Sequence, residues 1–192
     1  MQLMNFELTF VTSNDHKYNE ARTLFESSSI DLKRYSCELM EPNFETLEEI
    51  AEFKCKQAFE EIGKPVVVDD SGIFFEAYSN FPGVNSARVF KGIGFEGVLA
   101  LLKGKSRKAF FRSVCCYTCD GVNFEFFSGK LDGEITKEVS LDVPYEERLP
   151  YKRIFTPQGY DVPIGALSLK EITTFDHRSH AFRQLADFLS AS

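Results

Sequence analysis

Two adjacent carboxylates are the residues best suited to metal and water chemistry. Asp69 and Asp70 follow the apolar run Val66–Val68, and Mg²⁺ prefers carboxylate oxygens, which Glu41 and Glu45 in an earlier loop also offer. One carboxylate of the pair could orient or deprotonate an attacking water molecule. The alternative is an acidic turn that caps a helix. Because two charges beside a buried run need a partner, we favour a functional role.

A second polar cluster follows the first apolar segment. It consists of Thr12, Ser13 and Asn14, with Lys17 one turn further on. Where a strand leads into a helix, free N–H groups and the helix dipole favour phosphate, and the lysine adds a positive charge. An ordinary N-cap followed by a solvated lysine explains the same residues, and both interpretations stay open. A third cluster, Phe81–Arg88, combines a Pro-Gly turn with Arg88, whose guanidinium could hold a phosphate.

The hydrophobic pattern predicts the elements that carry these clusters. Helical spacing of Tyr18, Ala21, Leu24 and Phe25 predicts a first helix, and Gly63 ends a second. The β-α-β-α-β order that results favours a mainly parallel sheet, with ligands at the carboxyl ends of its strands. The other expected elements are strands over Glu7–Thr12, Leu32–Cys37 and Pro65–Val68 (ending at the two aspartates), helices over Thr46–Ile62, Gly94–Lys103 and Ser179–Leu189, and a hairpin of Lys108–Cys119 with Val122–Ile135.

Length and composition favour one globular domain over residues 1–192, with 43% hydrophobic and 27% charged residues. The net charge of -7 argues against a nucleic-acid or membrane partner. We find no signal peptide and no apolar run long enough to span a bilayer, so we expect a cytoplasmic protein. Cys116 and Cys119 form a CxxC that suits a redox or zinc site, but with an odd total of five cysteines we favour packing thiols.

The motifs together resemble the ITPase (Ham1/RdgB-like) family of nucleoside triphosphate pyrophosphatases, from the first strand to the last helix. The pair of Asp69-Asp70-Ser71-Gly72 and Pro82-Gly83 with Ser86-Ala87-Arg88 carries most of the specificity. The other matching residues are Thr12-Ser13-Asn14 with Lys17, Thr46–Ala51 with Lys54, and Ser179-His180.

The resemblance implies an α/β, elongated, two-lobed ITPase-like (Maf/Ham1) fold with a mixed, mainly parallel sheet and a central cleft. It also implies a homodimer that uses Mg²⁺ to release pyrophosphate from a nucleoside triphosphate. Glu41 and Asp70 would hold Mg²⁺, with Glu45 or Asp69 as further ligands, and Asp70 would be the general base. The substrate-binding residues implied are Thr12, Ser13, Asn14, Lys17, Lys54, Ser71, Arg88, Tyr151, Lys152 and His180.

The sequence departs from the family where the base is recognised. Family members carry an acidic residue where Lys152 stands, a lysine five residues before the closing histidine and an arginine directly after it. With His180 as that histidine, Phe175 and Ala181 occupy those two places, and Arg178 or Arg183 could substitute. An aspartate accepts hydrogen bonds and a lysine only donates them, so we expect an altered base pocket. A pyrophosphatase for a pyrimidine or modified-base nucleotide and a catalytically dead nucleotide-binding relative are the alternatives.

Overall fold

The computed structural model describes residues 6–26, 28–40, 43–79 and 81–191. Its first half is a parallel three-stranded unit in which β1 (Phe6–Val11) lies between β2 (Ile30–Tyr35) and β3 (Val66–Phe75). The crossovers are α1 (Asp15–Phe25) and α2 (Leu47–Ile62), close to the helices that the pattern predicts. Thr46 and Glu49 form a capping box at the start of α2, and Gly63 ends the helix with φ 67°.

The second half adds antiparallel strands. β3 pairs with β5 (Lys108–Thr118), β5 with β6 (Glu125–Ile135), and β6 with β7 (Phe155–Pro157), while the short β4 (Pro82–Gly83) pairs with β3. The order is β2-β1-β3-β5-β6-β7. The predicted α/β class with a mixed sheet is therefore confirmed. Parallel pairing is found among β2, β1 and β3, and antiparallel pairing in the rest of the described sheet.

The strand that carries the two aspartates is longer than expected. The sequence predicted that it ends at Val68, before the two aspartates. However, β3 continues to Phe75 because β5 pairs with it over its whole length, with Asp69 opposite Cys115 and Asp70 opposite Val114. Side chains alternate along a strand, so the two neighbouring carboxylates point to opposite faces of the sheet. The faces are distinct: Val67 packs with α1 and α5 residues, whereas Val68 packs with α2 residues.

Three further helices differ from the predicted elements: two have different bounds, and one was not predicted. α3 (Ser86–Leu101) begins eight residues before the expected Gly94, which instead marks a break inside it with φ 60°. α4 (Leu169–Phe175) was not predicted, and α5 (His177–Ala191) begins two residues before the expected Ser179. The 3₁₀ turns are η1 (Pro150–Arg153) and η2 (Ile164–Ala166).

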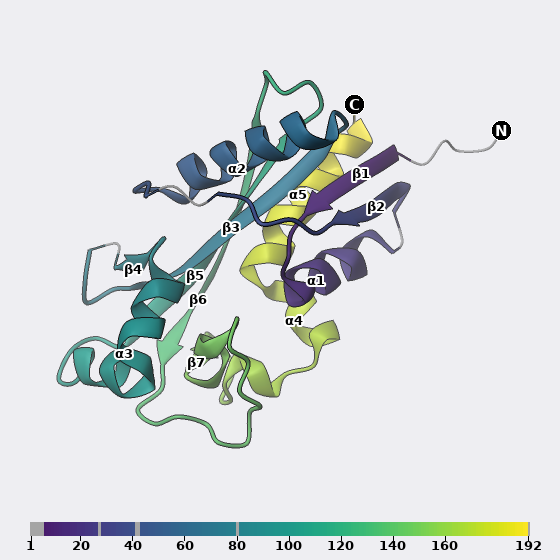
Figure 1. Cartoon of the computed structure of the whole chain (residues 1–192). Helices are drawn as coiled ribbons and strands as arrows, with labels where there is room; N and C mark the ends of the chain where they lie inside the picture. Colours follow the sequence, from purple (N-terminus) through teal and green to yellow (C-terminus); the bar gives the residue numbers. More distant parts are fainter. Residues whose placement is uncertain (1–5, 27, 41–42, 80, 192) are drawn as a thin grey trace.

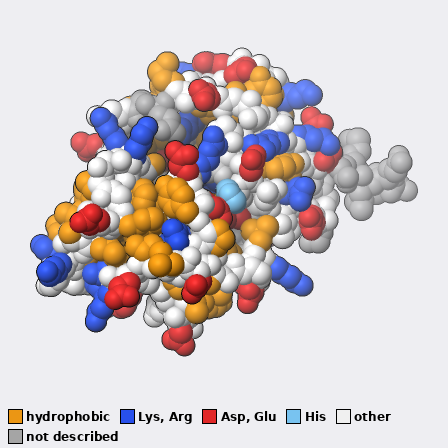
Figure 2. Space-filling model, turned by 60° about the horizontal axis from the view of Figure 1, so that its bottom comes forward, with side chains coloured by type: hydrophobic (Ala, Val, Ile, Leu, Met, Phe, Trp, Pro, Cys, Tyr) orange, Lys and Arg blue, Asp and Glu red, His pale blue; other side chains and the backbone are white. Residues whose placement is uncertain are grey.

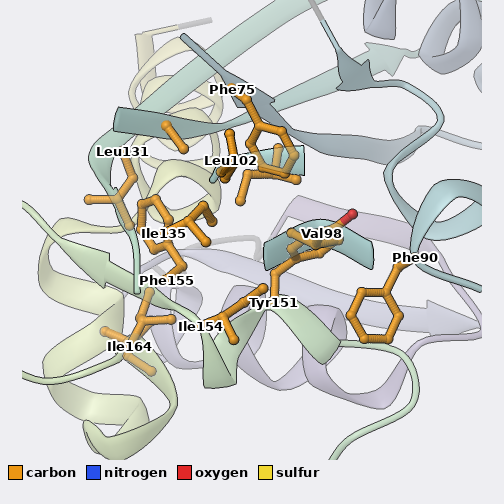
Figure 3. Packing of buried hydrophobic residues seen from close by; sticks show 13 residues of the cluster. Phe75, Phe90, Val98, Leu102, Leu131, Ile135, Tyr151, Ile154, Phe155 and Ile164 are labelled. Atoms are coloured by element: carbon orange, nitrogen blue, oxygen red, sulfur yellow. The ribbon is translucent and has the colours of Figure 1, made fainter. Parts of the chain in front are cut away.

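Three buried clusters hold these elements in place. One packs α1 and α5 against the sheet, with Phe10 and Phe182 edge to face at 5.1 Å. A second lies between α2 and the other face. The third, shown in Figure 3, joins α3 to the far ends of β3, β5 and β6 through residues such as Phe75, Tyr151 and Phe155. Figure 1 shows the long strands running between these regions. The division into two lobes stays a prediction.

The cysteines fit a packing role. Cys55, Cys115 and Cys116 are buried in the clusters between sheet and helices, Cys37 is half-buried and Cys119 is exposed, and all five thiols are free. Among the described residues, no helix is both long and apolar enough to cross a membrane.

Candidate active site

A cavity of about 1270 Å³ lies where the β1–α1 loop, the middle of β3 and the starts of α3 and α5 meet. Its lining combines charged and apolar side chains, and the surface view shows both kinds side by side (Figure 2). Most of the predicted site residues line it, namely Thr12, Ser13, Asn14, Lys17, Lys54, Asp69, Asp70, Ser71, Arg88, Tyr151 and Lys152. The topology thus gathers these predicted residues from five separate segments of the chain.

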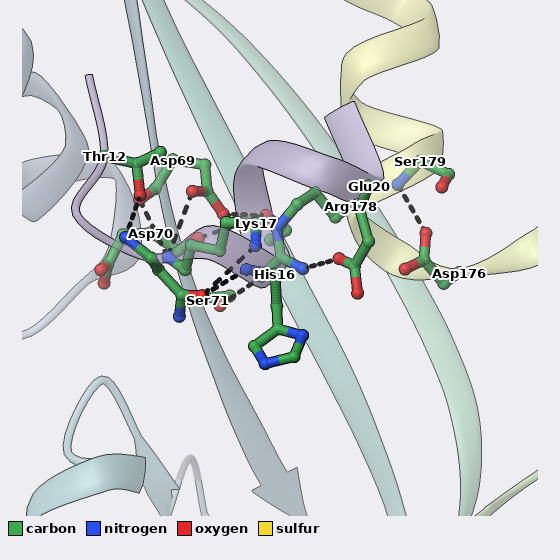
Figure 4. Close-up of polar contacts among 12 residues, drawn as sticks. Thr12, His16, Lys17, Glu20, Asp69, Asp70, Ser71, Asp176, Arg178 and Ser179 are labelled. Carbon is green, nitrogen blue, oxygen red and sulfur yellow. Dashed lines mark hydrogen bonds and ion pairs between the residues drawn. The ribbon is translucent and has the colours of Figure 1, made fainter. Parts of the chain in front are cut away.

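Asp69 lies at the centre of a buried ion network on the α1/α5 face. Its Oδ1 lies 3.1 Å from Lys17 Nζ, and its Oδ2 accepts hydrogen bonds from Arg178 Nε at 2.9 Å and from Ser113 Oγ at 3.3 Å. Arg178 also forms an ion pair with Glu20 (Figure 4). Burial raises the pKa of Asp69, but the charges of Lys17 and Arg178 outweigh it and hold that pKa below its usual range. Asp69 therefore stays ionised and holds the side chains of Lys17 and Arg178 in place.

Asp70 has a different environment on the α2 face. Its side chain is 14% exposed, against 0% for Asp69, and its Oδ1 lies 3.1 Å from Lys54 Nζ. Burial raises the pKa of Asp70, and the charge of Lys54 offsets this only in part. A carboxylate that reaches the cavity with a raised pKa is suited to accept a proton from a bound water molecule.

The loop after β1 forms the N-cap that one of the two interpretations of its sequence predicts, and phosphate binding stays a prediction. Asn14 is the N-cap of α1, and its Oδ1 accepts from the backbone N–H groups of His16 and Lys17 at 3.0 and 3.3 Å. The N-cap interpretation is thus confirmed for Asn14, but Lys17 is held by Asp69 rather than solvated. Thr12 Oγ1 accepts from the Asn14 N–H at 3.2 Å, which fixes the loop where it lines the cavity.

The 3₁₀ turn η1 places Tyr151 and Lys152 in the lining of the cavity. The Tyr151 hydroxyl donates to the Ser86 carbonyl at 3.1 Å, and its ring packs edge to face on Phe90. Lys152 Nζ lies 3.7 Å from Glu20 Oε1, so its charge faces the same buried acid as that of Arg178. Arg88 is exposed at the cavity edge, and Ser71 Oγ accepts from Arg178 Nη2 at 3.3 Å.

The sequence matches a family of known proteins. The model of the Ham1 family matches residues 8–188 of the chain. This chain belongs to the Ham1 family. It is 39% identical over 183 residues to the dITP/XTP pyrophosphatase of Thermococcus kodakarensis, covering 95% of this chain and 96% of that protein. The dITP/XTP pyrophosphatase of Methanopyrus kandleri is 37% identical, with 95% of each chain covered.

Solved structures agree on the fold. A HAM1 protein from Coxiella burnetii superposes with a TM-score of 0.81 at 23% identity, covering 97% of this chain and 100% of that one. The Ham1 protein of Staphylococcus aureus gives a TM-score of 0.78 at 25% identity, covering 96% and 98%.

The two histidines at the start of α5 have different environments. His180 is exposed and does not line the cavity, whereas His177 is buried there and stacks on Phe111 at 5.0 Å. We therefore propose His177, in place of His180, as the histidine that corresponds to the closing histidine of the family. With His177 as the closing histidine, the arginine that the family carries directly after it is present as Arg178.

The other departures change with this shift. Ala181 and Phe175 no longer stand at the two family positions, and Ile172 occupies the place of the family lysine. Arg183 is no substitute, since its guanidinium donates to the Thr173 and Thr174 carbonyls at the end of α4. The prediction for Lys152 does not depend on this shift and stays a prediction.

Of the four expected metal ligands, Asp69 and Asp70 line the cavity. Glu41 lies outside the described residues, and Glu45 is exposed and does not line the cavity. Within the described ranges there is no group of three or more His, Cys, Asp or Glu side chains suited to hold a metal ion.

Sequence reasoning missed several members of the buried network, namely Glu20, Ser113 and Asp176. Glu20 follows Lys17 by three positions on α1, a spacing that places both on one helix face. That spacing could have identified Glu20 as a candidate site residue. Ser113 and Asp176 carry no comparable signal, since strand register and the entry to α5 place them.

His177 should make the folded protein sensitive to mild acid. Burial, reinforced by the charge of Arg178, lowers the pKa of His177 well below 6.5. As pH falls below about 6.5, the unfolded chain therefore binds a proton there that the folded chain does not, and the free energy of unfolding falls. This loss amounts to as much as about 1.4 kcal/mol per pH unit.

Urea denaturation at several pH values between about 7 and 5 tests this linkage. We expect His177→Phe, whose ring can still stack on Phe111, to lose less stability over that range than the wild type. His180→Phe is the control, because the exposed His180 should leave the pH dependence unchanged. Equal slopes for the wild type and His177→Phe would contradict the assignment.

Proposed function

We propose that this Ham1 protein hydrolyses dITP- and XTP-type nucleoside triphosphates to the monophosphate and pyrophosphate. Relatives that carry the name dITP/XTP pyrophosphatase align over 95% of the chain, which supports an enzyme of that class. The observation that carries the proposal is the unequal pair in β3. Asp69 is sealed and ion-paired, and Asp70 reaches the cavity with a raised pKa.

The charges of the cavity suggest how the substrate lies. Lys17, Lys54 and Arg88, with the start of α1, place positive charge around the β1–α1 loop, where the triphosphate would bind. The base would then extend toward Tyr151 and Lys152 at η1. In this orientation Ser71 would contact the substrate beside Asp70.

Asp70 would act as the general base for water attack. A water molecule next to Asp70 would give up a proton to the carboxylate as the water oxygen bonds to the α-phosphorus. The bond from the α-phosphorus to the bridging oxygen breaks, and pyrophosphate leaves with the electron pair. Lys54 orients Asp70, and the positive side chains offset the charge that builds on the phosphates.

The residues present fit a divalent cation of the kind that family members use, and we propose Mg²⁺. Mg²⁺ is commonly bound by one or two carboxylates together with substrate phosphates and water. Asp70 meets this description because it faces the cavity, and Glu41 is the second proposed ligand. Both oxygens of Asp69 are taken by cations, so we propose that it positions Lys17 and Arg178 instead. A bound cation would neutralise phosphate charge and polarise the reacting group.

Lys152 distinguishes the proposed base pocket from that of other family members. Since a lysine only donates hydrogen bonds, it would favour a base with a carbonyl or anionic edge. The pyrimidine or modified-base pyrophosphatase remains the second candidate on this observation. The homodimer and the cytoplasmic location stay predictions.

The test is pyrophosphate release with Mg²⁺ from ITP, XTP, dUTP and the four standard triphosphates, for the wild type and Lys152→Ala. We expect turnover with a preference that Lys152→Ala changes by about tenfold, the scale of one specific contact. Arg153→Ala is the control, because Arg153 holds the Ser140 and Leu141 carbonyls and does not line the cavity. A clear preference for ITP that Lys152→Ala leaves unchanged would refute the altered pocket. Absence of turnover with every nucleotide would refute the proposed pyrophosphatase activity.

A further inference from the structure

Arg34 is a cationic side chain beside the β1–α1 loop that the mechanism above does not use. It lies near the end of β2, opposite Phe10 of β1. Because side chains alternate along a strand, Arg34 shares a face with Ile30 and Leu32, which pack in the cluster under α1 and α5. Arg34 does not line the cavity. Any effect of Arg34 on a bound nucleotide therefore passes through the residues that it contacts.

Arg34 contacts the loop and the first turn of α1 at three points. Its Nε donates to the Thr12 carbonyl at 3.1 Å, and its Nη1 lies 2.6 Å from Asp15 Oδ1. Its guanidinium also lies over the ring of Tyr18, 5.4 Å from the centroid. The carboxylate of Asp15 compensates the charge of Arg34. The contribution of Arg34 to phosphate binding is therefore geometric, because it holds the loop rather than adding a free positive charge.

A second arginine holds the next carbonyl of the loop. Arg148 Nη1 donates to the Ser13 carbonyl at 2.7 Å. Arg148 belongs to the segment before η1, which His16 also contacts, with its Nε2 2.9 Å from Glu146 Oε2. Two consecutive peptide groups of the β1–α1 loop are thus each bound by a guanidinium, one from β2 and one from the segment before η1.

These contacts determine the direction of the amide groups in the loop. A trans peptide group is planar, so its N–H and C=O point in opposite directions. Since the Thr12 carbonyl points toward Arg34, the Ser13 N–H points away from it. The next amide, that of Asn14, donates to Thr12 Oγ1 at 3.2 Å, and Asn14 caps the helix that carries Lys17. Rotation of either peptide group would therefore change the orientation of the donors at the start of α1.

We propose that Arg34 is a positioning residue that fixes the β1–α1 loop in the conformation that binds the triphosphate, with Arg148 holding the adjacent carbonyl. The inference rests on the function proposed above. Without Arg34 the nucleotide has to order the loop as it binds, and the cost of ordering weakens binding. Because Arg34 lies outside the cavity that Asp70 faces, its loss should raise KM more than it lowers kcat.

The test compares Arg34→Met with Arg34→Gln. Glutamine places an amide nitrogen where arginine has Nε, so it can still donate to the Thr12 carbonyl, whereas methionine has a similar length and no donor. We expect Arg34→Met to raise KM for the best nucleotide of the panel about tenfold, the scale of one hydrogen bond from a charged group. Arg34→Gln should restore most of this loss, since the exposed pair with Asp15 contributes little. In both variants kcat should stay within about threefold of the wild type.

Lys33→Met is the matched control. Lys33 precedes Arg34 on β2, points to the opposite face of the sheet, pairs with Asp31 at 2.8 Å and does not line the cavity. Its variant removes the same charge from the same strand and should leave KM unchanged.

Calorimetric titration with inorganic triphosphate measures binding without turnover. We expect the Kd of Arg34→Met to rise about tenfold and that of Arg34→Gln to change less. Wild-type KM and Kd in Arg34→Met, with or without a lowered melting temperature, would overturn the role of Arg34. Equal weakening in Arg34→Met and Arg34→Gln would also overturn it, because the donor would then not be the cause.

The same titration separates this role from the proposed function. A wild type that binds inorganic triphosphate but releases pyrophosphate from no nucleotide would refute the pyrophosphatase, while the Kd values of the variants would still decide the role of Arg34. A wild type that does not bind inorganic triphosphate would refute the phosphate site at the β1–α1 loop, and the role of Arg34 with it.

Discussion

Replacing Asp70 with asparagine should lower kcat for pyrophosphate release by about 10²–10⁴-fold, the usual contribution of a general base. The amide keeps the size of the side chain and can still contact Lys54, but it cannot take a proton from water. Because Asp70 is 14% exposed and faces the cavity, the change should not unfold the protein. Steady-state assays with the best nucleotide of the panel measure kcat, and nucleotide binding should survive.

Asp132→Asn is the matched control for this change. Asp132 is an exposed carboxylate on β6, paired with Lys130 at 2.7 Å, and lies outside the cavity. Its variant should keep wild-type kcat. If Asp70→Asn retained kcat within tenfold of the wild type, another group would have to activate the water, and the division of roles in β3 would be wrong.

Replacing Arg178 with leucine should cause the largest loss of stability among single changes at this site, about 3–5 kcal/mol of the free energy of unfolding. Arg178 is 3% exposed and holds both Asp69 and Glu20. Without the guanidinium, the two buried carboxylates lose a common counter-charge. Urea denaturation gives the free energy of unfolding directly.

Two comparisons show whether the charges are the cause. Arg183→Leu removes an arginine of the same helix whose guanidinium donates to the Thr173 and Thr174 carbonyls, and should cost about 1 kcal/mol. Adding Glu20→Gln to Arg178→Leu should restore part of the loss, because one uncompensated charge disappears. A cost for Arg178→Leu no greater than that of Arg183→Leu would contradict the network.

Local sequence signals predicted the elements well where one mechanism decides them. Helix α2 has its capping box at Thr46 and its left-handed end at Gly63, both visible in the sequence. The β5–β6 hairpin follows from two apolar runs around Asp120-Gly121. The first part of α3 was missed because glycines interrupt its pattern, and Gly94 indeed breaks the helix.

Pairing between strands that are distant in the sequence determines the features that the local pattern did not predict. No local sequence signal predicts that β3 continues past Asp70. The continuation depends on pairing with β5, in which Val114, some forty residues later in the chain, lies opposite Asp70. The same holds for His177 and His180, whose roles depend on which side of α5 meets the sheet. Residue type alone indicated the candidate phosphate and carboxylate residues, whereas the different environments of Asp69 and Asp70 depend on the three-dimensional structure.

Because Asp69 and Asp70 point to opposite faces of the sheet, the protein should tolerate substitutions in β3 better than insertions or deletions. Adding or removing one residue in β3 before this pair would turn each carboxylate to the opposite face of the sheet. Asp70, the proposed general base, would then be buried, and Asp69 would face the cavity. Point changes nearby adjust rates or stability, but a change in length here exchanges the two functions. Loops far from β3 should therefore vary freely in length among active forms, and this strand should not.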